Sequence, residues 1–88
     1  MRIRVRRTGG FAGIERSAEV DTSALPDAQE WHVLAERALS AGRDAPPAGV
    51  PDGFQYEITV DGRTVHAADP RLSQEQRALI SRVLKEGA

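Results

Sequence analysis

The stretch FQYEITVDGRTVH, residues 54–66, contains two alternating runs separated by Asp61-Gly62. Every second residue of the first run is apolar, and Asp-Gly is among the strongest sequence signals for a two-residue β-hairpin turn. A turn of that length fixes the register, so Ile58 is expected opposite Val65 on one face of the hairpin. This stretch therefore predicts a hairpin with one apolar face.

A second pair of alternating runs lies near the N-terminus. Residues 2–6 alternate arginine with Ile or Val, and the glycine-rich segment 8–13 separates them from a second run. In that run Ile14, Ala18 and Val20 alternate with Glu15, Ser17 and Glu19. The outward arginines of one strand would face the glutamates of the other, and each such opposite-charge pair contributes about 0.2–1 kcal/mol. We therefore expect a salt-bridged hairpin whose arginines have local partners.

Two amphipathic segments follow the hairpins. The first helix is expected to begin near Pro26 or Asp27 and to stop at Gly42, and His32 is expected to face solvent. The second is expected to begin at Ser73, because the Ser73–Gln76 spacing is that of a capping box. The apolar stripe of the first helix comprises Trp31, Leu34, Ala35, Ala38 and Ala41. The predicted core contains Trp31, Leu34, Ile58, Val65, Leu79, Ile80 and Val83.

The element order is thus β-β-α-β-β-α. It predicts an α+β fold in which an antiparallel four-stranded sheet carries two helices packed on one face. The 88 residues suffice for one domain, residues 1–88. Residues 43–53 contain three prolines and two glycines, which predict a linker loop.

Composition narrows the class of function. The chain has no cysteine, its formal net charge is −1, and His32 and His66 lack metal-ligand spacing. No nucleophile-base pair or phosphate-binding loop occurs. We expect a cytoplasmic, monomeric protein that is not an enzyme, has no catalytic residues, no metal and no cofactor, and binds neither membrane nor nucleic acid.

The glycine-rich segment holds the candidate binding residues. Glycine suits a tight or bulged connection, but a bulky apolar side chain within it needs another explanation. Phe11 either packs against the end of the core or contacts a partner, and the sequence leaves both interpretations open. The predicted partner-binding residues are Gly9, Gly10, Phe11, Ala12 and Gly13.

Three motifs together resemble the emfourin-like family of small bacterial inhibitors of protealysin and related thermolysin-like zinc metallopeptidases. They are M-R-I-x-V-x-R-x-G-G-F-A-G-I at residues 1–14, V-D-T-S-x-L at 20–25 and F-x-Y-x-I-T-V-D-G at 54–62. The resemblance implies an intracellular inhibitor that binds its peptidase tightly at or over the active-site cleft without being a substrate. Clefts of this class accept a bulky apolar side chain, a role the resemblance suggests for Phe11.

Two other classes of function remain open at this stage. One is a protein-interaction or assembly module that uses exposed sheet edges, for example as a homodimer, and size-exclusion chromatography would reveal self-association. The other is a nucleic-acid-binding domain using Arg2, Arg4, Arg6 and Arg7, whose binding would weaken steeply with salt.

Overall fold

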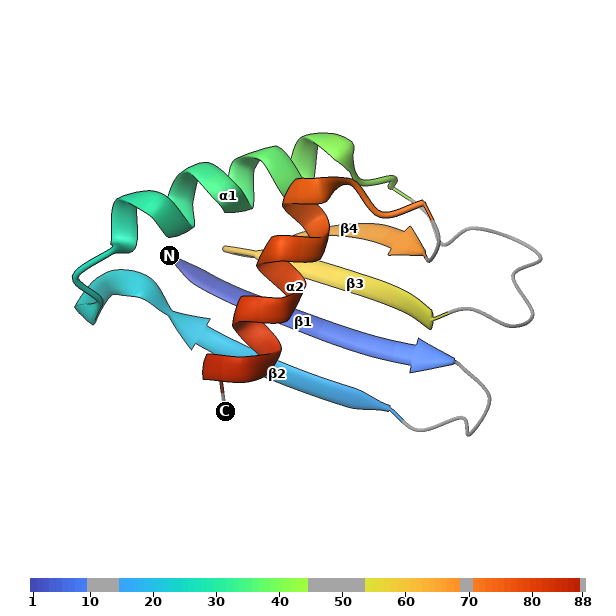
Figure 1. Ribbon diagram of the computed structural model, residues 1–88, viewed down its shortest axis with the longest axis horizontal. Helices are drawn as coiled ribbons and strands as arrows, with labels where there is room; N and C mark the ends of the chain where they lie inside the picture. The colour runs from blue at the N-terminus through green and yellow to red at the C-terminus, as the bar shows by residue number, and fades with distance from the viewer. Residues whose placement is uncertain (10–14, 45–53, 69–70, 88) are drawn as a thin grey trace.

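A computed structural model describes residues 1–9, 15–44, 54–68 and 71–87 (Figure 1). The elements are β1 (Arg2–Gly9), β2 (Arg16–Asp21), the short 3₁₀ helix η1 (Thr22–Ala24), α1 (Ala28–Ala41), β3 (Phe54–Val60), β4 (Arg63–Ala68) and α2 (Gln74–Glu86). The order β-β-α-β-β-α is as predicted.

The strands form one antiparallel sheet in the order β2-β1-β3-β4. Both helices cover the same face of this sheet (Figure 1), which confirms the α+β architecture. The N-terminal strand is central, because β1 pairs with β2 on one side and with β3 on the other. In the described part of the chain, no helix is long and apolar enough to cross a membrane.

The β3–β4 hairpin has the register predicted from its turn, with Ile58 opposite Val65. Asp61 has a φ of 48° and Gly62 a φ of 87°. Positive φ at both central residues is the signature of a type I′ turn, the type that matches the twist of two-residue hairpins. The Asp61 side chain also accepts a hydrogen bond of 2.9 Å from the backbone N–H of Arg2, so the turn is tied to the start of β1.

The first hairpin carries the expected ion pairs on its outer face. Arg2 Nε lies 3.1 Å from Glu19, and Arg6 Nε lies 2.9 Å from Glu15. Two of the three outward arginines, Arg2 and Arg6, thus have the local partners that the sequence suggested, and Arg4 has no ion pair among the described residues. Ile14, expected on the inner face, lies outside the described residues.

The core lies between the sheet and the helices. Trp31 is 1% exposed, and of the predicted core set only Leu34 is not buried. Leu34 is half-buried because it lies on the side of α1 that borders a groove, while Leu39, which was not in the predicted set, is buried. Ala41 was also expected on the buried stripe, but it is exposed at the last residue of α1. The stripe is therefore rotated slightly from the one predicted.

The capping box of α2 is present as predicted. Ser73 Oγ accepts from the backbone N–H of Gln76, and Gln76 Oε1 accepts from the backbone N–H of Ser73, both at 3.0 Å. The prediction that His32 faces solvent is wrong. His32 is half-buried, with Nε2 3.2 Å from Thr22 Oγ1, because η1 folds back against the start of α1.

A cluster of three side chains joins the start of α1 to α2. Asp27, the residue before α1, accepts hydrogen bonds from Trp31 Nε1 at 3.2 Å and from Arg82 Nη2 at 2.6 Å. The Arg82 guanidinium also lies over the Trp31 ring, 4.2 Å from its centroid. The hydrogen bond from Arg82, supported by that from Trp31, lowers the pKa of Asp27. Asp27 therefore links the start of α1 to α2 through its side chain. That side chain does not cap α1.

We expect Asp27→Asn to remove part of the acid sensitivity of folding. A carboxyl group whose pKa is lowered by folding stabilises the native state above its unfolded-state pKa of about 3.9, and that contribution disappears as the pH falls through the lowered native pKa. Urea midpoints measured from about pH 6 down to about pH 2 should fall less steeply for Asp27→Asn than for wild type. Asp44→Asn, at an exposed residue, is the matched control and should follow wild type. If the urea midpoint falls equally steeply with pH in Asp27→Asn and in wild type, the contacts of the Asp27 carboxylate do not stabilise the native state.

Candidate functional site

One end of the sheet brings together the boundaries of all four strands. β1 ends there at Gly9, which pairs with Phe54 at the start of β3. β2 begins there at Arg16, and β4 ends there at Ala68. We call this region, defined by Gly9, Arg16, Phe54 and Ala68, the Gly9 end of the sheet. The Asp61-Gly62 turn lies at the opposite end.

Gly9 is the one predicted partner-binding residue that the structure describes. Its φ is 86°, a conformation that costs other L-residues about 1–2 kcal/mol, so the last residue of β1 requires glycine. The remaining predicted residues, Gly10, Phe11, Ala12 and Gly13, lie outside the described residues. The structure therefore describes Gly9 alone among the candidate residues, and the assignment of the other four remains a prediction.

Arg7 and Phe54 form a stacked pair beside Gly9. The guanidinium carbon of Arg7 lies 4.3 Å from the Phe54 ring centroid, a cation–π geometry. The Phe54 and Tyr56 rings are 6.4 Å apart and tilted by 56°. Arg7 Nε is buried and has no hydrogen-bond partner among the described residues. Sequence reasoning missed this pair, although the shared parity of Arg7 and Val5 along β1 indicates that Arg7 faces the helices.

A second arginine anchors the outer face of the same region. Arg6 donates two hydrogen bonds to the Glu15 carboxylate, at 2.9 and 3.0 Å, and lies 3.6 Å from Glu57 on β3. Hydrogen bonding between Arg6 and Glu15 raises the pKa of Arg6 and lowers the pKa of Glu15. Because Glu15 directly precedes β2, this bidentate contact ties together the two chain segments that border the predicted binding residues.

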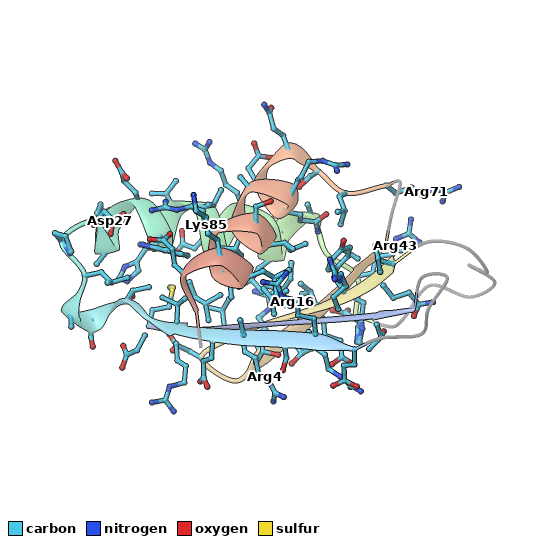
Figure 2. All side chains as sticks on the ribbon, turned by 60° about the horizontal axis from the view of Figure 1, so that its bottom comes forward. Arg4, Arg16, Asp27, Arg43, Arg71 and Lys85 are labelled. Carbon is cyan, nitrogen blue, oxygen red and sulfur yellow. The ribbon has the colours of Figure 1, made fainter. Side chains whose placement is uncertain are left out.

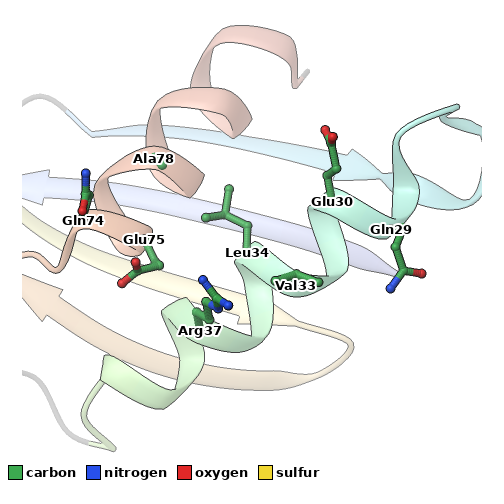
Figure 3. Close-up of a pocket in the computed structure, with 8 residues that line it drawn as sticks. All are labelled: Gln29, Glu30, Val33, Leu34, Arg37, Gln74, Glu75 and Ala78. Carbon is green, nitrogen blue, oxygen red and sulfur yellow. The ribbon is translucent and has the colours of Figure 1, made fainter.

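The helix layer contains a separate groove between α1 and α2 (Figure 3), with a volume of about 450 Å³. Val33 and Leu34 from α1 and Ala78 from α2 supply its apolar surface, and Val33 is 41% exposed. Glu30, Arg37 and Glu75 supply charges around it (Figure 3). The residues that line the groove include no nucleophile-base pair, and all of them lie on the two helices.

The described residues offer no group of three or more His, Cys, Asp or Glu side chains that could hold a metal ion. The two histidines lie on different elements, with His32 in α1 beside Thr22 and His66 in β4.

Comparison with known proteins identifies one family. The family model described as Emfourin matches residues 5–84, which is most of the chain and includes every helix and strand at least in part. No curated protein and no solved structure matches the chain.

Proposed function

Because the chain belongs to the emfourin family, we propose that it inhibits a thermolysin-like zinc metallopeptidase by binding at or over the active-site cleft through its first hairpin. The family implies a role as a metallopeptidase inhibitor. The class of target and the mode of binding are our proposal, in which Gly9, Gly10, Phe11, Ala12 and Gly13 lie at or beside the contact.

The observation that carries the proposal is the way the base of this hairpin is held. β1 pairs with β2 from Arg2 to Arg7 and with β3 from Ile3 to Gly9. On the outer face of the sheet, two hydrogen bonds join Arg6 to Glu15. On the inner face, Arg7 stacks on Phe54. A segment presented from a fixed base loses less conformational freedom on binding, which favours affinity.

Phe11 is the proposed anchor. Aromatic side chains dominate the energetics of many interfaces when they enter an apolar pocket, and glycines on both sides let the backbone approach a partner closely. In this proposal the protein occupies the cleft as an inhibitor and has no hydrolase activity of its own.

Inhibition kinetics test this function. Purified protein should lower the activity of a thermolysin-like peptidase on a short peptide substrate in a saturable, stoichiometric manner, and a serine peptidase serves as the control. Added Zn²⁺ should not restore activity, and mass spectrometry should find the inhibitor uncleaved after incubation. Activity unchanged at inhibitor concentrations far above that of the enzyme would overturn the proposal.

A further inference from the structure

The groove between α1 and α2 lies on the outer side of the helix layer. Figure 2 shows the molecule from the side, with both helices on one side of the sheet and Arg4 projecting from the other. In Figure 3 the sheet lies behind the helices, so the groove faces away from the sheet. Among the described residues, Val33 is the only large apolar side chain that is exposed, and Leu34 beside it is half-buried. The groove therefore presents apolar surface to a partner.

Four residues of α1 line this groove from one side of the helix. Glu30, Val33, Leu34 and Arg37 follow the i, i+3, i+4, i+7 pattern, which puts them on the same side of a helix. We call these four residues the α1 face. Its apolar pair lies in the middle, with an acid one turn before it and a base one turn after it. Glu30 and Arg37 are about 10 Å apart along the helix axis, and neither has an ion pair among the described residues.

The α1 face is complementary to itself. If a two-fold axis passes between Val33 and Leu34, the α1 helices of two copies run antiparallel. Each Glu30 then faces Arg37 of the second copy, and each Val33 faces Leu34 of the second copy. A two-fold interface needs a patch of this kind, because both copies use the same surface. Parallel pairing would bring like charges together, so the charges also select the antiparallel direction.

The α2 side of the groove adds one more charge. Glu75 lies on α2 and is the other charged residue that lines the groove, so Glu30 and Glu75 outnumber Arg37 there. The field of these carboxylates favours a cation, which Arg37 of the second copy supplies. The second copy therefore brings both the apolar pair and the charge that the groove requires.

We propose that the chain forms a weak two-fold homodimer in which the α1 face of each copy occupies the groove of the other. The sequence favoured a monomer, with a homodimer through exposed sheet edges as an alternative, whereas this pairing uses the helix layer. The α1 face spans only about two helical turns, so the interface belongs to the class below about 1,200 Å² of total buried area, which associates transiently. We expect a dissociation constant of about 0.1 mM. The inference goes beyond the proposed function and does not rest on it, because self-association is measured without a peptidase.

Exchange of charges across the dimer tests this pairing. Sedimentation equilibrium of the wild-type chain, from about 10 µM to about 1 mM at about 0.15 M salt, should show the average mass rising toward that of a dimer. Arg37→Glu places two pairs of like charges across the interface, and so does Glu30→Arg. Each variant alone should associate at least about tenfold more weakly than wild type. An equimolar mixture of the two should associate about as strongly as wild type, because every facing pair again joins an acid and a base.

Arg63→Glu is the matched control for net charge. Arg63 is an exposed residue of β4, and its substitution changes the charge by the same amount as Arg37→Glu. This control should associate within about twofold of wild type. Thermal unfolding at low concentration checks that each variant is folded. If Glu30→Arg folds poorly, because it removes an acid from the first turn of α1, the comparison of Arg37→Glu with Arg63→Glu decides the question.

Amide spectra of the ¹⁵N-labelled protein locate the contact. Dilution from about 1 mM to about 10 µM should shift the α1 face and Ala78 on the facing helix, and leave the edge strands β2 and β4 unchanged. Three results would overturn the proposal. They are a wild-type chain that stays monomeric throughout, Arg37→Glu that associates as strongly as Arg63→Glu, and dilution shifts confined to β2 or β4.

Discussion

Trp31→Ala is expected to lower the free energy of unfolding by about 3–5 kcal/mol, the range for deleting a large buried aromatic side chain. Trp31 is 1% exposed and is the largest of the fully buried side chains. Its loss would open a cavity between α1 and the sheet, and it would also remove the hydrogen bond to Asp27 and the stacking of Arg82. Urea denaturation at neutral pH measures the change.

Val33→Ala is the matched control in the same helix. Val33 is 41% exposed, so its truncation should change the free energy of unfolding by less than about 0.5 kcal/mol. A loss of less than about 1 kcal/mol for Trp31→Ala would show that the core is not organised around this residue.

Phe11→Ala is expected to weaken inhibition by about 2 kcal/mol or more, which is about thirtyfold in the inhibition constant. In the proposed complex its ring fills an apolar pocket of the peptidase, so removing it costs binding while the free energy of unfolding stays within about 0.5 kcal/mol of wild type. Inhibition constants and urea denaturation of the same preparations give both quantities.

Stability distinguishes this role from the alternative that the sequence left open. If Phe11 closes the end of the core, Phe11→Ala should lower the free energy of unfolding by about 3–5 kcal/mol, and inhibition would fall only as a consequence. Val33→Ala again serves as the control, since it removes an exposed apolar group from the helix layer without touching the hairpin. Unchanged inhibition and unchanged stability would remove Phe11 from both roles.

The features that the sequence predicted correctly are specified by short segments of chain. Asp61-Gly62 determines both the turn and the register of its hairpin, because two residues with positive φ leave one geometry for the flanking strands. The capping box of Ser73 and Gln76 needs only four consecutive residues. Such signals can be interpreted without knowing the rest of the fold.

The features that were missed depend on residues far apart in the chain. Arg82 reaches Asp27 across 55 residues, and Arg43 joins the edge of the sheet at His66. Periodicity identifies which face of an element is apolar, but it does not say which polar side chains meet across elements. Gly9 and its strand were therefore predictable from the sequence, whereas the stacking of Arg7 on Phe54 is visible only in three dimensions.

Mapping the bound surface tests the central claim most directly. Amide spectra of the ¹⁵N-labelled, deuterated protein, recorded with and without a thermolysin-like peptidase, report which residues contact it. We predict the largest changes at the Gly9 end, at residues 7–16 and Phe54, with the Asp61-Gly62 turn unchanged. Changes concentrated at that turn or in the groove around Val33, with an unperturbed Gly9 end, would contradict the account.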